Sequence, residues 1–364
     1  MRADLPDAVA AAISRCANPA LVFDLARIEA NLRAFAAAAR AHGITVLFAA
    51  KSFPHAAVRA LAAELFDGFD AASPGELAEL PPARIVSIVD PTGRAGASVP
   101  AGRHARVVVG CETADQVRAA PPGADVALRL SASLVARDPA VGAVQDGAGH
   151  RRSRFGLDVD PARRAAHLRE LAAAAGSRRV GLHVHHGAVA ATGGERFVAT
   201  ARAALAAAAD AGLTPRFLDA GGAWHAVADL PAALAALRAA VPADVELLVE
   251  PGRAIAADAG FATGHIVAAR DLDDRALRIS DLSRICHLRW SAVDLVHRAP
   301  HPGTGLPLLV AGPTCFEDDV LGQWTIEPTT LSPGDRLTLR GVTGYALGWN
   351  HAFAGIPPAD VVIA

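Results

Sequence analysis

Lys51 is the only lysine among the 364 residues, and every other basic side chain is arginine or histidine. It follows five apolar residues, Val46 to Ala50, which are typical of a buried strand. A lysine amine can lose its proton, which a guanidinium cannot, and can then form a Schiff base with an aldehyde cofactor. The alternative is that a composition rich in alanine and arginine has kept one lysine by chance. The position of Lys51 at the end of a strand favours the Schiff-base role over chance.

Polar residues follow four more short apolar segments in the same way. In chain order these are Asp70 with Ser73 and Glu76, His183 with His185 and His186, Asp219 with Gly221 and Gly222, and Glu250 with Gly252 and Arg253. His183 and His185 are two positions apart, so they share one face of a strand and could bind a metal. No further histidine or cysteine follows at a fitting spacing. Stacking of an imidazole on a flat ring is therefore the better use.

Two of these groups suit a phosphate and a heterocycle. Gly221 and Gly222 offer backbone N–H groups without a Cβ in the way, although a plain turn would look the same. Arg253 follows a Pro-Gly turn and could pair with the same phosphate. Glu250, at the end of a buried segment, is costly unless it is paired, and a protonated ring nitrogen is a suitable partner.

The elements that must position these residues alternate between strands and helices. We expect strands at 45–50, 67–72, 84–89, 105–109, 125–130, 179–185, 216–220 and 245–250. We expect helices at 27–41, 54–64, from near 74, and at 112–120, 160–175, 194–211 and 229–240. This α/β alternation predicts a (β/α)8 TIM barrel, since a doubly wound sheet would leave the lack of a GxGxxG motif unexplained. Barrel active sites lie at the carboxyl ends of the strands, where all five polar groups fall.

The pattern changes after Arg253, where strands with Gly, Pro and Asp turns replace helices. These strands are expected at 261–270, 276–280, 307–311, 322–327, 335–341 and 359–363. We therefore expect a separate C-terminal β domain, a sandwich or barrel, that also takes the N-terminal strand 19–24. The predicted domains are a barrel at 27–257 and a β domain formed by 1–26 and 258–364.

Composition excludes several classes of protein. The formal net charge of −2 argues against a nucleic-acid or anionic-membrane partner. No apolar run is long enough for a membrane span, and the first residues lack the pattern of a signal peptide. The four cysteines are scattered without a CxxC motif, which predicts neither disulfides nor a zinc site and favours a reducing cytoplasm.

Taken in order, the motifs resemble one family. They are FAAKSF around Lys51, GFDAASPGEL at 68–77, SRFGLD at 153–158, HVHHG at 183–187, LDAGG at 218–222, EPGRA at 250–254, GPTCFEDD at 312–319 and GYA near the end. The chain is similar over nearly its whole length to the fold-type III decarboxylases that use pyridoxal 5'-phosphate. These include the ornithine, diaminopimelate, arginine and carboxynorspermidine decarboxylases, and their fold is related to that of alanine racemase.

The resemblance implies a role for each matching residue. Lys51 would hold pyridoxal phosphate as a Schiff base, His185 would stack on its ring, and Glu250 would face the pyridine nitrogen. The other residues expected near the cofactor are Asp70, Gly221, Gly222, Gly252, Arg253 and Tyr345, the only tyrosine.

A second set of residues concerns the substrate, a small molecule of the amino-acid class. The resemblance implies that Cys315 comes from the partner subunit of a head-to-tail homodimer and gives a proton to the substrate carbon. Asp319, with Glu317, would help bind the distal group of the substrate. Phe316 replaces an acidic residue of the family, which puts a simple diamino acid in doubt.

The reaction implied is decarboxylation, because the racemases of this fold place an arginine where Glu250 stands. A racemase or epimerase, and a PLP-binding regulator without catalysis, are the alternatives. Other departures from the family pattern are Phe53, Ala188 and Ala223. The KSF and CFEDD forms resemble the carboxynorspermidine branch more than the ornithine branch. The expected substrate is an amino acid with a polar or cationic tail.

Overall fold

The computed structural model describes residues 5–131, 144–145, 151–152, 155–157, 160–185, 194–296, 307–325 and 331–364. His186 and Ala188 lie outside these ranges. The chain divides into two compact units. One contains Asn31–Lys51 and His55–Ile255, and the other contains the residues up to Ala30, Ser52–Pro54 and Ala256–Ala364.

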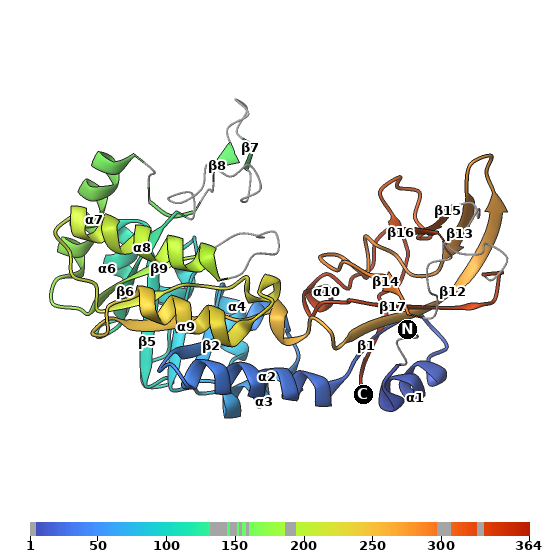
Figure 1. Ribbon diagram of the computed structural model, residues 1–364, viewed down its shortest axis with the longest axis horizontal. Coiled ribbons are helices and arrows are strands. Elements are labelled where there is room, and N and C mark those ends of the chain that lie inside the picture. Colours follow the sequence, from blue (N-terminus) through green and yellow to red (C-terminus); the bar gives the residue numbers. More distant parts are fainter. Residues whose placement is uncertain are drawn as a thin grey trace. The chain divides into compact units, whose positions relative to one another are not determined.

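The first unit contains a closed barrel of parallel strands, which confirms the predicted TIM-barrel fold (Figure 1). The order around the barrel is β10-β11-β2-β3-β4-β5-β6-β9. The strands are β2 (Thr45–Ala49), β3 (Gly68–Ala71), β4 (Ile85–Ile88), β5 (Arg106–Cys111), β6 (Asp125–Leu130), β9 (Val180–Val184), β10 (Phe217–Asp219) and β11 (Glu246–Val249). Each corresponds to an expected strand.

Four of the helices that surround the barrel begin at a Ser, Thr or Asp residue that caps them. Ser73 and Thr113 accept hydrogen bonds from the backbone N–H of Glu76 and Gln116, and Asp160 and Asp229 act in the same way. The helices are α2 (Leu25–Arg40), α3 (Ala56–Leu65), α4 (Pro74–Glu79), α5 (Arg94–Ala97), α6 (Ala114–Ala119), α7 (Pro161–Ala175), α8 (Glu195–Asp210) and α9 (Leu230–Ala240). Only α5, a single four-residue turn, has no counterpart among the expected helices.

Side chains fill the barrel interior in layers. A buried apolar layer consists of Leu47, Ile85, Val108, Ala127, Phe217 and Leu248. Because successive side chains of a strand alternate between its two faces, residues two positions further on point to the same interior. These residues include Ala49, Ser87, Arg129, Asp219 and Glu250. An apolar layer is thus followed, toward the carboxyl ends of the strands, by a largely polar one.

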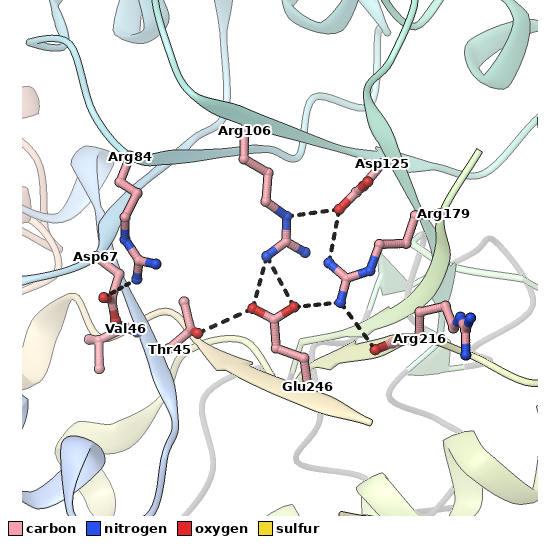
Figure 2. A network of polar contacts seen from close by, with 9 residues as sticks. All are labelled: Thr45, Val46, Asp67, Arg84, Arg106, Asp125, Arg179, Arg216 and Glu246. Carbon is pink, nitrogen blue, oxygen red and sulfur yellow. Dashed lines mark hydrogen bonds and ion pairs between the residues drawn. The ribbon is translucent and has the colours of Figure 1, made fainter. Parts of the chain in front are cut away.

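Charged residues at the opposite end of the barrel form one network (Figure 2). Arg106 donates to Asp125 (2.8 Å) and to both oxygens of Glu246 (2.8 and 3.0 Å). Arg179 donates to the same two acids at 3.2 and 2.7 Å. Both guanidinium groups also lie over the ring of Phe217, at 5.5 and 5.4 Å from its centroid. The network covers the apolar layer at the amino ends of the strands.

The second unit contains a mixed eight-stranded sheet, mostly antiparallel, as the predicted β domain requires. Its strands are β1 (Ala20–Phe23), β12 (Gly260–Asp271), β13 (Ala276–Ser280), β14 (Asp294–Leu295), β15 (Pro307–Ala311), β16 (Val320–Thr325), β17 (Arg336–Arg340) and β18 (Asp360–Ile363). The N-terminal strand β1 pairs with β12 and β18, so it joins this sheet as expected. Helix α1 (Asp7–Arg15) packs Val9 and Ile13 in one apolar cluster with Val22.

Two further short strands, β7 (Val144–Gln145) and β8 (Arg151–Arg152), form a separate pair. Among the described residues, no helix combines the length and the apolar character that crossing a membrane requires.

Candidate active site

Lys51 and Asp70 form an ion pair at the carboxyl ends of β2 and β3. The strand register places Ala49 beside Asp70, and the chain then turns into a short 3-10 helix, Ala50–Ser52, that carries Lys51. The Nζ atom of Lys51 donates to Oδ2 of Asp70. Asp70 is completely buried, while a third of the Lys51 side chain is exposed. Burial, and then the charge of Glu250, raise the pKa of Asp70 to about 7.

Glu250 lies directly after β11 and is 3 % exposed. Its Oε1 is 3.8 Å from Nε2 of His183, which is also buried. Burial alone would raise the pKa of Glu250, but His183 and Lys51 outweigh it and hold the pKa below its ordinary value. Burial lowers the pKa of His183, and the charge of Glu250 opposes this shift. The site therefore contains a buried carboxylate that stays ionised at neutral pH.

Asp219, at the end of β10, is the third buried acid of the site. Its Oδ1 accepts a hydrogen bond from the N–H of Gly221 (2.9 Å). Burial, followed by the charge of Glu250, raises the pKa of Asp219 well above its ordinary value. One ligand atom from each of His183, Asp219 and Glu250 lies within 4.8 Å of the other two. Because Asp219 favours its protonated form, Glu250 carries the negative charge of this group.

The two glycines pack closely against His185. Gly222 donates its N–H to Nδ1 of His185 at 3.0 Å. Gly221 has φ +66°, and a Cβ there would lie 2.7 Å from the same nitrogen. A Cβ on Gly222 would lie 3.0 Å from Cε1 of His185 and from the carbonyl oxygen of Glu250. Burial lowers the pKa of His185 to about 3, so the ring is neutral. These contacts explain why this turn requires glycine.

Ala223 and Arg253 follow the strand ends that carry the two glycines and Glu250. Ala223 occupies the position of the family's third glycine and adopts the left-handed conformation, φ +73°. Arg253 follows Gly252 and begins the 3-10 helix Arg253–Ile255. Its Nη1 lies 3.3 Å from Nε2 of His225. Burial, and then Arg253, lower the pKa of His225, so this imidazole is a neutral neighbour of the guanidinium.

The predicted substrate residues form a second group, within the β unit. Cys315, Phe316 and Glu317 are exposed, and Cys315 is the one exposed member of the four cysteines. The ring of Phe316 lies 5.3 Å from that of Phe353, centroid to centroid. Tyr345 is half-buried and begins the helix α10 (Tyr345–Gly348).

Asp319 differs from its neighbours because it is 1 % exposed. Its two oxygens accept hydrogen bonds from Ser283, Arg284 and Thr314 of the same unit. The expected contact of Asp319 with the substrate therefore competes with donors already in place.

Sequence reasoning gave no role to His225 and no cofactor role to His183 or Asp219. His183 and Asp219 did carry a signal, since each stands at the end of a predicted barrel strand. Their pairing with Glu250 depends on strand register, which places His183 beside Asp219 and which the sequence does not specify. His225 follows a glycine-rich turn and is brought to Arg253 only by the tertiary fold.

These residues fit pyridoxal phosphate, the cofactor that the resemblance implies. Within the described part of the chain, Oε1 of Glu250 and both ring nitrogens of His183 are buried without a hydrogen-bond partner. Such atoms are rare in proteins unless a ligand or water satisfies them. Lys51 offers an amine and Arg253 a guanidinium for the phosphate. The predicted phosphate role of Gly221 and Gly222 would require their N–H groups to leave Asp219 and His185, to which they donate.

Comparison with known proteins gives the same result. Residues 25–257 match the model of the family described as pyridoxal-dependent decarboxylase, pyridoxal binding domain. A diaminopimelate decarboxylase from Deinococcus radiodurans is 27% identical over 370 residues, which cover 96% of this chain and 91% of the relative.

Solved structures share the fold at low sequence identity. The arginine decarboxylase of Paramecium bursaria Chlorella virus, bound to agmatine, has a TM-score of 0.74 at 19% identity and covers 96% of each chain. The lysine/ornithine decarboxylase of Vibrio vulnificus with putrescine has a TM-score of 0.74 at 18% identity, covering 98% of this chain and 97% of that one. A mutant diaminopimelate decarboxylase of Helicobacter pylori with L-lysine has a TM-score of 0.76 at 18% identity, covering 98% and 93%. Because the matched family model spans well over half of the chain, this protein belongs to the pyridoxal-dependent decarboxylases, and its cofactor is pyridoxal phosphate.

Proposed function

We propose that this enzyme removes the α-carboxylate of an amino acid that has a polar or cationic tail. The observation that carries the proposal is the buried Glu250, which lies near His183 and whose charge helps raise the pKa of Asp70, the partner of Lys51. Pyridoxal phosphate, when bound, accepts the electron pair that remains on the α-carbon as CO2 leaves.

Lys51 is the residue proposed to hold the cofactor. Its amine forms a Schiff base only when it is deprotonated, and Asp70 can take up the proton because its pKa is raised to about 7. Asp70 also orients Nζ through their hydrogen bond. The pair thus supplies both an anchoring amine and a local place for its proton.

Glu250 is proposed to keep a proton on the pyridine nitrogen. A carboxylate whose pKa is held low stays charged and favours a cationic partner. His183 and Asp219 lie close to it, and the raised pKa of Asp219 leaves the negative charge on Glu250. This arrangement favours loss of CO2 over racemisation, which in this fold is associated with an arginine at the position of Glu250.

Cys315 is proposed to return a proton to the carbon that has lost CO2. The S–H bond breaks, the proton forms a C–H bond, and a thiolate remains. As the resemblance implies, we propose that Cys315 acts in a head-to-tail homodimer, from the partner subunit. Mixing Lys51→Ala and Cys315→Ala variants should then restore part of the activity, because one site in the mixed dimer is intact. Two inactive variants that stay inactive after mixing and subunit exchange would contradict a shared site.

The names of the relatives support the substrate class. Arginine, lysine, ornithine and diaminopimelate, on which they act, all have a distal amine or guanidine. Exposed Glu317 is the acid we propose for the tail, while Phe316 and Phe353 offer ring faces that attract both alkyl stems and cations. Carboxynorspermidine is a further candidate.

The deciding experiment measures CO2 release by the PLP-loaded protein from lysine, ornithine, arginine, diaminopimelate, 2,4-diaminobutyrate and carboxynorspermidine. Release from one of them, lost in Lys51→Ala, would establish the reaction and the substrate together. Exchange of the α-proton in D2O without CO2 release would instead show a racemase or epimerase. Protein that binds PLP but neither releases CO2 nor exchanges the α-proton would favour a regulator.

A further inference from the structure

We infer that Asp319 is a positioning residue, which fixes the segment carrying Cys315 rather than binding the tail of the substrate. The inference rests on the proposed function for its catalytic consequence. The geometry itself lies within one compact unit and involves only described residues.

The Asp319 carboxylate is the centre of a buried hydrogen-bond cluster. Oδ1 accepts from the N–H of Arg284 (2.6 Å) and of Ile285 (3.4 Å), and Ser283 Oγ lies 3.0 and 3.1 Å from the two oxygens. Oδ2 accepts from Thr314 twice, from its hydroxyl at 2.7 Å and from its N–H at 3.2 Å. Hydrogen bonds to a charged acceptor are about twice as strong as neutral ones.

These contacts join two segments that are far apart in the sequence. One is Ser283–Ile285, and the other is the turn that begins at Gly312 and ends at Asp319 itself. The turn is closed by backbone bonds from Gly312 N–H to the Asp319 carbonyl (2.7 Å) and from Asp319 N–H to the Phe316 carbonyl (3.0 Å). A Cβ on Gly312 would lie 2.3 Å from Oδ2, so the carboxylate fills the space that a side chain would take.

The consequence for the site concerns Cys315. The residue before it, Thr314, is tied to Asp319 through both its hydroxyl and its N–H. Cys315, Phe316 and Glu317 are exposed on the outer side of the same turn. An exposed turn is normally mobile, and a thiol that must reach one carbon requires a fixed backbone. Asp319 holds this backbone in place through its buried hydrogen bonds to Thr314.

A role in tail binding fits this geometry poorly. A carboxylate offers about four lone-pair directions, and the donors already in place occupy them. A substrate cation would have to displace buried bonds and enter a position that is 1 % exposed.

The test uses the PLP-loaded enzyme and three substitutions. Asp319→Asn replaces one acceptor oxygen by a donor. Thr314→Val keeps nearly the same shape and removes the hydroxyl, which donates to Asp319 and also accepts a longer bond from the Phe316 N–H. Thr200→Val is the matched control, because the buried Thr200 hydroxyl, on α8, has no hydrogen-bond partner among the described residues. The first measurement is the rate at which iodoacetamide alkylates Cys315, with Cys315→Ala as the background.

We expect Asp319→Asn and Thr314→Val to change the alkylation rate at least about threefold and Thr200→Val to leave it unchanged, because a lost hydrogen bond to a charged group releases the turn. Unchanged alkylation in both variants would overturn the inference. Thr314→Val keeps the test valid if Asp319→Asn does not fold.

The second measurement separates positioning from substrate binding. We expect kcat to fall about tenfold with KM nearly unchanged, and Cys315→Ala/Thr314→Val to be no slower than Cys315→Ala alone. A large rise in KM for a cationic substrate at constant kcat would instead assign Asp319 to the tail and overturn the inference. If alkylation changes while Cys315→Ala keeps full rate and product, positioning stands and the proposed proton donor fails.

Discussion

The two ends of the barrel treat buried charge in opposite ways. At the amino ends of the strands, Arg106 and Arg179 each bind both Asp125 and Glu246 (Figure 2). Hydrogen bonds from these guanidinium groups lower the pKa of Glu246, although its burial alone would raise it. Acids and bases are matched there, and the network stabilises the fold.

At the carboxyl ends, the acids outnumber their partners. Asp70, Asp219 and Glu250 are buried near one another, and each has an oxygen atom without a hydrogen-bond partner in the described residues. Burying such groups lowers stability unless a ligand or water satisfies them, as the proposed cofactor would at this end. The comparison indicates that the amino ends of the strands stabilise the fold, whereas the carboxyl ends carry the groups proposed for chemistry. Changes at the amino end should affect folding, and changes at the carboxyl end should affect chemistry.

The sharpest test of this division is Lys51→Arg. Arginine keeps a positive charge beside Asp70 but forms no Schiff base, so we expect turnover to fall by about 10³-fold or more. The free energy of unfolding should change little. Absorbance of the Schiff base, kcat and urea denaturation measure the three quantities. Retained turnover would contradict the role of Lys51 and the assignment of chemistry to this end.

The second test uses pH on the cofactor-free protein. Asp70 has a pKa of about 7 in the folded protein against an ordinary 3.8, so folding binds a proton between these values. Stability from this group is therefore complete below about pH 4 and is lost as the pH rises to about 7. Asp70→Asn removes the dependence.

The quantity to compare is the free energy of unfolding of Asp70→Asn minus that of the wild type. This difference should rise by up to about 4 kcal/mol between pH 4 and 8. Buried histidines titrate in both proteins and cancel in the difference. Urea denaturation across this range measures it, and a constant difference would show that Asp70 titrates normally.

A third test compares glycines at opposite ends. Gly221 and Gly43 have similar left-handed φ values, +66° and +63°, but a Cβ on Gly43 meets nothing within 4 Å. Alanine at either position should cost about 1 kcal/mol in backbone strain. Only Gly221→Ala should also weaken PLP binding, by about 10- to 100-fold, because its Cβ collides with His185. Equal PLP affinity in the two variants, measured by fluorescence titration, would argue against the glycine turn as a cofactor site.

The smallest expected effect is at the amino end. Glu246→Gln removes the charge that Arg106 and Arg179 share, and since these side chains are partly exposed we expect a loss of only about 1–2 kcal/mol in unfolding free energy. Activity and PLP affinity should stay at the wild-type level. Glu79→Gln, which breaks the single ion pair with Arg59 on an exposed acid, should cost less. A fall in kcat for Glu246→Gln would break the separation of tasks.

Local sequence patterns predicted most of the barrel. Apolar runs ending in polar residues mark each strand, and Ser73 and Asp160 mark helix starts by capping. The four-residue α5 and the two-residue β14 have too few residues for a periodic signal.

The sequence predicted the residue types of the candidate site better than their contacts. Lys51, Glu250 and the glycines stand out by type and place along the chain. The burial of Asp319 and the pairing of Arg253 with His225 depend on segments that are distant in sequence, and no local pattern encodes such contacts.

The close packing inside the barrel also constrains how the chain can change. Gly181 of β9 has no side chain, and the ring of Phe217 occupies the space: a Cβ at position 181 would lie 2.5 Å from three ring atoms. Enlarging residue 181 alone creates a clash, and shrinking residue 217 alone leaves a cavity and removes the ring on which two guanidinium groups stack. Each single substitution therefore gives a less stable protein. Related sequences should therefore exchange these two positions together, as a covarying pair of small and large residues.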